Sequence, residues 1–162
     1  AAAGVGDQLV VLGGMTLDAD GKFQPARAVW SLASSGGEWQ PLPALPEARV
    51  GAITPCPVLA DGRVVIAGGY SEIIPGVQRE HPGFNPHTGV FNPATGAWAA
   101  GPDVPHAPVP DRDSAGDPGP APMLGAPAVV WRELIVAISG EVRIATRSPQ
   151  VLALPLPATR KP

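Results

Sequence analysis

The stretch that decides the fold runs Asp61-Gly62-Arg63-Val64-Val65-Ile66-Ala67-Gly68-Gly69. It opens on Asp-Gly, a dipeptide that favours a tight hairpin turn. The apolar run that follows is typical of a strand buried on both faces. The same order of turn, apolar strand and small pair recurs at residues 6–14 and 131–140, the last closing on Ser139-Gly140. The chain therefore contains repeats of one β unit.

The segments after each pair also repeat. A second strand ending in a turn is predicted at residues 28–32, 89–93 and 150–154. The first two repeats then add a tryptophan strand with a proline exit, at residues 38–43 and 97–102, which the third repeat lacks. The stretch Asn92-Pro93-Ala94-Thr95-Gly96-Ala97-Trp98 is the most typical of kelch repeats. We predict an all-β, kelch-type β-propeller with about three four-stranded blades. The expected units are 1–46, 47–105 and 106–162.

The small pairs begin at residues 13, 68 and 139, farther apart than the typical kelch period of about 50 residues. The surplus falls mainly at residues 70–88 and 106–123, the latter predicted to be an exposed insertion. Proline or glycine interrupts every candidate helix. About three blades do not close a ring, since propellers have roughly four to eight. The sequence thus predicts half of a six-bladed ring. The other half would come from a second copy of the chain in a homodimer, from a different second chain or from a missing segment.

Composition supports a folded, turn-rich β protein. The 162 residues include 20 glycines and 22 prolines, yet 44 % of residues are hydrophobic and 15 % are charged, enough to bury a core. A formal charge of −3 argues against nucleic acid or an anionic membrane surface as the main partner. The single Cys56 is expected to be a small hydrophobe between Pro55 and Pro57. The four tryptophans are expected to pack between blades rather than to form sugar platforms.

The third pair is followed by a glutamate and two arginines: Glu141, Arg143 and Arg147. In a propeller, the loops after these strands gather at one mouth of the central channel. A carboxylate within reach of arginines there suits acid–base chemistry and anion binding. Spacing alone leaves a solvated charge cluster as the other interpretation.

Residues 138–151 resemble a hallmark segment of the N-acetylneuraminate (sialic acid) mutarotase family, also called N-acetylneuraminate epimerases, which are six-bladed kelch propellers. The family pattern is a small residue, Gly-Glu, a basic residue, and then Arg-Thr or Arg-Ser. Glu141 and Arg147 match the proposed active-site pair of that family. Family members usually carry Pro-Gly where Ile144-Ala145 stand here. The resemblance covers about half of a family member and implies a periplasmic or secreted protein.

The resemblance implies an isomerase that interconverts the α and β anomers of N-acetylneuraminate or a related sugar acid without a cofactor. Glu141 would act as base and then acid, and Arg147 would bind the substrate carboxylate, with Arg143 as a second cation. A second polar cluster follows Gly69, in which Glu72, Arg79 and His81 are candidates to contact the substrate. The other interpretation of this cluster is a polar loop with no ligand role. The alternative function is a non-catalytic kelch module that binds a glycan or a protein.

Other chemistries find little support in the sequence. The spacing of His81, His87 and His106 fits no ordinary metal-ligand pattern. There is no Gly-x-Ser-x-Gly elbow and no phosphate-binding loop.

Overall fold

The computed structural model describes residues 1–73, 84–106, 123–143 and 146–157. All regular structure in these ranges is β, arranged as antiparallel sheets. No helix in the described part of the chain is long and apolar enough to cross a membrane.

The first sheet is the complete blade that the sequence predicts. Its strands lie in the spatial order β1 (Ala2–Val5), β2 (Gln8–Leu12), β5 (Val29–Ala33) and β6 (Gln40–Leu42). The strand before the first glycine pair, β2, is paired on both sides, because β1 forms a hairpin with it and β5 returns along its other edge. The glycine pair therefore ends an interior strand of the sheet.

The second and third sheets each contain three strands in the described residues, fewer than the four predicted. The second is β7 (Val64–Ile66), β8 (Gly89–Asn92) and β9 (Ala97–Ala100). The third is β10 (Ala128–Trp131), β11 (Leu134–Arg143) and β12 (Thr146–Pro155). In the second sheet, the expected first strand is reduced to one isolated bridge between Val58 and Val64. Each sheet lies within one of the predicted units, whose boundaries stay a prediction.

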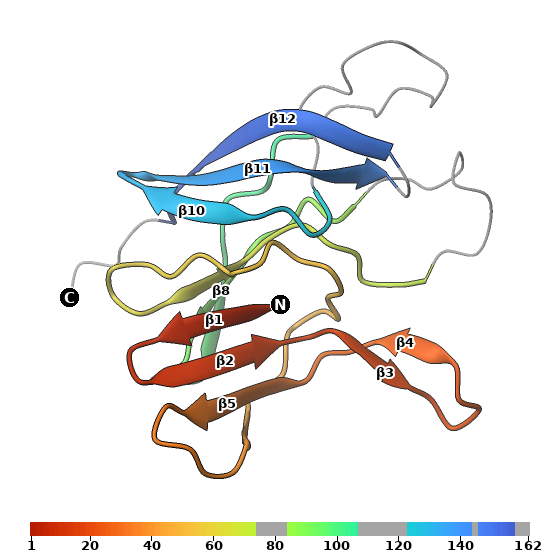
Figure 1. Ribbon diagram of the computed structural model, residues 1–162, viewed down its shortest axis with the longest axis vertical. Helices are drawn as coiled ribbons and strands as arrows, with labels where there is room; N and C mark the ends of the chain where they lie inside the picture. Colours follow the sequence, from red (N-terminus) through yellow and green to blue (C-terminus); the bar gives the residue numbers. More distant parts are fainter. Residues whose placement is uncertain (74–83, 107–122, 144–145, 158–162) are drawn as a thin grey trace.

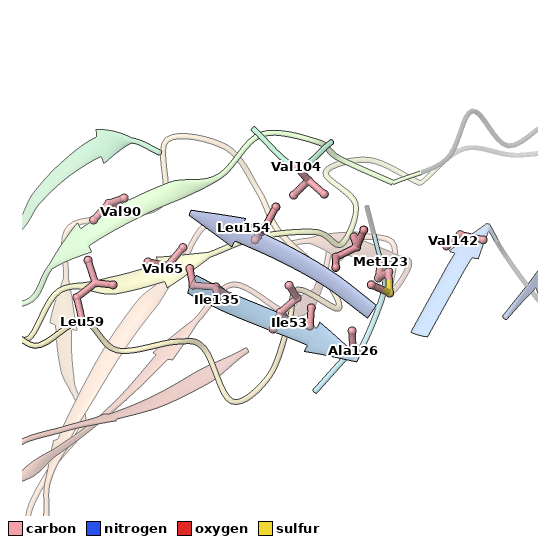
Figure 2. Close-up of a cluster of buried hydrophobic side chains, with 13 residues drawn as sticks. Ile53, Leu59, Val65, Val90, Val104, Met123, Ala126, Ile135, Val142 and Leu154 are labelled. Atoms are coloured by element: carbon pink, nitrogen blue, oxygen red, sulfur yellow. The ribbon is translucent and has the colours of Figure 1, made fainter. Parts of the chain in front are cut away.

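Strand alternation in β7 organises the core. Val64 and Ile66 pack into a cluster with Val10, Leu12 and other residues of the first sheet. Val65 and Ala67 pack on the opposite side, against the third sheet. Figure 1 accordingly shows β8 between the first sheet and the β10–β12 sheet, and Figure 2 shows Val65 and Val90 near Ile135 and Leu154.

Burial on both faces is therefore correct for β7 but wrong for β2 and β11. All three residues of β7 are buried, whereas the burial pattern of β2 and β11 alternates. The physical reason is position, since among the described residues the middle sheet packs against a sheet on each face, whereas each outer sheet packs against a sheet on one face. The apolar pattern of a strand shows that both of its faces can be buried. Whether they are buried depends on which other elements pack against them.

The glycine pairs let successive units approach closely. A Cβ at Gly13 would clash with the Arg49 carbonyl oxygen, and one at Gly68 would clash with the Met123 carbonyl oxygen. Both glycines also have positive φ, 61° and 67°, where side chains are strained. Backbone hydrogen bonds join the units at the same points, with Gly14 N donating to Arg49 O at 2.8 Å. The small residues that mark the repeat thus fasten one sheet to the segment leading into the next.

Sequence reasoning missed a hairpin after the first glycine pair, since it placed the next strand only at residues 28–32. Strands β3 (Met15–Leu17) and β4 (Phe23–Pro25) pair there, outside the main sheets. Asp18 organises the turn, because its Oδ1 accepts the Asp20 and Lys22 amides, both at 2.9 Å. The Lys22 amide is the main cause that lowers the pKa of Asp18. The Asp20-Gly21 dipeptide was the available signal.

The cysteine prediction is confirmed, and the tryptophan prediction only in part. Cys56 is buried in the cluster between the first two sheets. Trp98 stacks on the buried Phe91, with ring centroids 4.5 Å apart. Trp30, Trp39 and Trp131 are instead 41 %, 45 % and 55 % exposed, because they lie on the outer sheets where no described element covers them.

Candidate functional site

The structure brings Glu141 and Arg147 together. They are direct partners in the antiparallel register of β11 and β12. Arg147 Nη2 lies 3.7 Å from Glu141 Oε1, a loose ion pair rather than a tight hydrogen bond. The arginine side chain is 79 % exposed and that of the glutamate is 24 % exposed. The carboxylate is thus held near the sheet, while the guanidinium remains accessible to a ligand.

The backbone before Glu141 is irregular in a way that its sequence explains. Ser139 has a positive φ of 56° and Gly140 a φ of 128°, and the register shifts between Ile138 and Gly140. A Cβ at Gly140 would lie only 3.1 Å from the Met123 and Ala126 Cβ atoms. Ser139 Oγ donates to Ser148 O at 3.0 Å, across the two strands. This bulge re-aims the end of β11 and sets the position of Glu141.

A backbone bridge to Leu124 also holds Glu141 in place. The Leu124 amide donates to Glu141 O at 2.7 Å, and the Glu141 amide donates to Leu124 O at 3.2 Å. Val142 is fully buried in the core toward the second sheet. Glu141 and Arg143, on either side of it, are only partly buried. The two polar side chains therefore lie away from that core.

The second predicted cluster is only partly described. Arg79 and His81 lie outside the described residues. Glu72 is exposed, and within the described ranges no hydrogen bond or ion pair joins it to Glu141. Asn85 Nδ2 donates to both Ser71 Oγ and Glu47 Oε2, each at 2.7 Å. The structure thus forms a polar cluster beside the second glycine pair.

His87, one of three histidines considered as metal ligands, contacts an acid instead. Its Nδ1 lies 3.1 Å from Asp103 Oδ1, and both side chains are largely exposed. In the described part of the chain, no group of three or more histidine, cysteine or acidic residues could hold a metal ion.

Sequence reasoning missed Arg49, a buried arginine beside the second glycine pair. Its Nη1 donates to Gly68 O at 3.0 Å and to His87 O at 3.3 Å, and its Nη2 pairs with Glu47 Oε2 at 3.1 Å. Burial lowers the pKa of the guanidinium, and the nearby Glu47 carboxylate partly offsets that effect. Arg49 therefore ties the second glycine pair to the polar cluster. The residues next to Arg49 in the sequence gave no signal of this role, because Gly68 and His87 are distant in the chain.

The whole chain resembles a solved structure described as "Structure of YjhT". The likeness has a TM-score of 0.70 and covers 99 % of this chain, at 17 % sequence identity. The chain folds as a partial β-propeller. It spans about half of YjhT, since the match covers 52 % of that chain. No protein-family profile matches the sequence, and no curated protein matches it either.

In this partial propeller, the Glu141–Arg147 pair combines three properties that a binding site for a small acid needs. It offers a carboxylate that can accept or donate a proton, a guanidinium that can bind an anion, and a rigid strand pair that holds both. The partly buried Arg143 at the end of β11 adds a second positive charge to the same part of the third sheet.

Proposed function

We propose that this chain carries the active-site blade of an isomerase similar to the sialic acid mutarotases. The substrate would be N-acetylneuraminate or a related sugar acid, interconverted between its α and β anomers. The observation that carries the proposal is the cross-strand pairing of Glu141 and Arg147 directly after Ser139-Gly140. The hallmark resemblance of residues 138–151 and the propeller fold support the same assignment.

The reaction needs one group that can both accept and donate a proton. Glu141 takes the proton of the anomeric hydroxyl while the ring carbon–oxygen bond breaks, and it then delivers that proton to the ring oxygen. The resulting open-chain ketone closes again after rotation, with the proton movements reversed. No oxidant, reductant or second substrate is consumed. The 24 % exposure of Glu141 suits this role, because the carboxylate is reachable yet held by its backbone bridge.

The substrate's own carboxylate distinguishes a sugar acid from a neutral sugar. Arg147 is the residue to bind it, since a guanidinium can hold a carboxylate through two parallel hydrogen bonds. Its 3.7 Å separation from Glu141 leaves it free to rotate toward a ligand. Arg143 supplies further positive charge near the substrate carboxylate. The rest of the sugar would be contacted by the second polar cluster, through Glu72, Arg79 and His81.

The test is anomer exchange measured by NMR on the chain and on Glu141→Gln. Glutamine keeps the size and hydrogen-bonding capacity of the side chain but cannot cycle a proton. We expect the catalysed exchange rate to fall by at least about 100-fold, the lower end of a typical acid–base contribution. Glu133→Gln is the matched control, because Glu133 lies in the turn between β10 and β11 of the same sheet. It should leave the rate unchanged.

A second variant separates binding from proton transfer. Arg147→Met should weaken binding of the sugar acid while leaving binding of a neutral sugar alcohol of similar size unaffected. Full activity in Glu141→Gln would remove the glutamate from the mechanism. Binding without any catalysed exchange in the unaltered chain would favour the non-catalytic module instead.

A further inference from the structure

Tyr70 has the same backbone contacts in the second unit that Glu141 has in the third. Each residue directly follows the small pair of its unit. Val50 N donates to Tyr70 O at 2.9 Å, and Tyr70 N donates to Val50 O at 3.0 Å. This isolated antiparallel bridge is repeated between Leu124 and Glu141. Tyr70 and Glu141 therefore occupy equivalent positions in successive units.

The two bridges are also joined to each other. The sequence Val-Gly-Ala at residues 50–52 is matched by Leu-Gly-Ala at residues 124–126. Gly51 and Gly125 both have positive φ, 63° and 62°. The Gly125 amide donates to the Gly51 carbonyl oxygen at 2.8 Å. Because each glycine directly follows a bridged residue, this hydrogen bond places the two bridges side by side.

The first unit supplies a third residue at this position. The second glycine of each pair donates its amide to the segment that leads into the next unit, at 2.8 Å for Gly14 and at 3.1 Å for Gly69. Met15 directly follows Gly14, as Tyr70 follows Gly69. In Figure 1, β2 and β11 run in the same direction, so Met15 and Glu141 lie at the same end of their sheets. Met15, Tyr70 and Glu141 thus form a series with one residue in each unit.

Side chains of neighbouring residues in this series reach each other. The Tyr70 hydroxyl donates to the Met15 sulfur atom at 3.6 Å, although the two residues are 55 positions apart in the sequence. Met15 is 42 % exposed and Tyr70 is partly exposed. A thioether sulfur is a weak acceptor, so an oxygen atom of a ligand would replace it readily. The phenol hydroxyl is therefore available to a bound molecule.

We propose that Tyr70 is a further substrate-binding residue of the candidate site, with its hydroxyl hydrogen-bonded to an oxygen atom of the sugar acid. This role rests on the proposed function, because Tyr70 would contact the same ligand as Glu141 and Arg147. The bridge of Tyr70 lies beside the bridge of Glu141, and the Tyr70 side chain reaches a neighbouring unit. A phenol hydroxyl both donates and accepts hydrogen bonds, which suits a ligand that carries several hydroxyl groups.

Tyr70 is the only tyrosine in the chain, so a tyrosine-labelled sample reports on this position alone. The unaltered chain, isotope-labelled in its tyrosine and in its backbone amides, is titrated with N-acetylneuraminate and followed by NMR. We expect the ring signals of Tyr70 and the amide signals of Glu141 and Arg147 to shift with one dissociation constant. Shifts of these amides without any shift of the tyrosine ring would overturn the role of Tyr70 alone. No shift at any of the three residues would overturn the proposed function as well.

Tyr70→Phe tests the hydroxyl, because phenylalanine keeps the ring and removes only the polar group. We expect the dissociation constant for N-acetylneuraminate to rise about 3- to 10-fold, which corresponds to the net contribution of one ordinary hydrogen bond. A dissociation constant equal to that of the unaltered chain would show that the hydroxyl does not contact the ligand, and would refute the proposed role.

Met15→Leu is the matched control, because it removes the sulfur acceptor and keeps an apolar side chain of similar size. It leaves the Tyr70 hydroxyl in place and should leave the dissociation constant unchanged. Equal weakening by Met15→Leu and Tyr70→Phe would show that the hydroxyl acts only by holding Met15, which contradicts direct contact with the ligand. The NMR titration uses the unaltered chain, so the test does not depend on the folding of either variant.

Discussion

Replacing Gly68 with alanine should destabilise the protein far more than the same change at Gly21. Both glycines have left-handed backbone, with φ of 67° and 74°. They differ in their surroundings, because a Cβ at Gly21 meets nothing within 4 Å, whereas one at Gly68 collides with the Met123 carbonyl oxygen. The pair of variants thus isolates the close approach between the second unit and the third.

The expected losses of unfolding free energy follow from two effects, the left-handed backbone and the collision with the Met123 carbonyl oxygen. Left-handed backbone costs an alanine about 1–2 kcal/mol, and the stiffer unfolded chain returns about 0.4–1 kcal/mol, so Gly21→Ala should cost about 1 kcal/mol. Gly68→Ala adds an overpacking cost of about 1–3 kcal/mol, for about 2–4 kcal/mol in all. For a chain of this size, each kcal/mol lowers the Tm by about 2–4 °C.

The assay is urea unfolding followed by tryptophan fluorescence, with the slope of the transition compared between variants. We expect both variants to keep the slope and Gly68→Ala to show the much lower midpoint. Equal midpoints would refute the reasoning, because the contact with the Met123 carbonyl would then contribute nothing. A slope that changes in Gly68→Ala alone would show that the third sheet had detached instead.

Two further predictions concern the cluster between the first two sheets. Phe91→Ala should cost about 3–5 kcal/mol in unfolding free energy, because the ring is fully buried and stacked on Trp98, while Phe23→Ala on the exposed hairpin should cost less than about 0.5 kcal/mol. Burial raises the pKa of the Cys56 thiol from 9.0 to about 12, so this group should make the unfolding free energy fall as the pH rises above 9, and Cys56→Ala should make that fall shallower. A Cys56 thiol that reacts rapidly with a maleimide in the folded protein at pH 8 would contradict its burial.

Much of the fold was predictable because its signals are local. The Asp61-Gly62 turn, the apolar run after it and the closing glycines each reflect backbone or burial preferences of a few neighbouring residues. The same logic located β8 and β9 from the Asn92–Trp98 turn. It failed at the expected first strand of the second sheet, which is reduced to the Val58–Val64 bridge, because strand length depends on pairing partners.

Part of the candidate site could likewise be predicted from local sequence, and part of it could not. The hallmark segment identified Glu141 and Arg147, whose cross-strand pairing follows once β11 and β12 form a hairpin. Arg49 escaped notice because its role depends on Gly68 and His87, residues distant in the chain that only the folded backbone brings to it. A charged side chain read from sequence is expected to be exposed, and only its contacts show otherwise.

The sequence by itself determined that this protein is built from repeated β units closed by small residues, because turn and burial preferences act within a few residues. Only the tertiary structure decided which strand faces are covered. Alternating residues of β7 enter two different cores, while the equivalent faces of β2 and β11 stay open. Covering a face requires a second surface in contact with it, and which surface that is depends on how the sheets are arranged around the molecule.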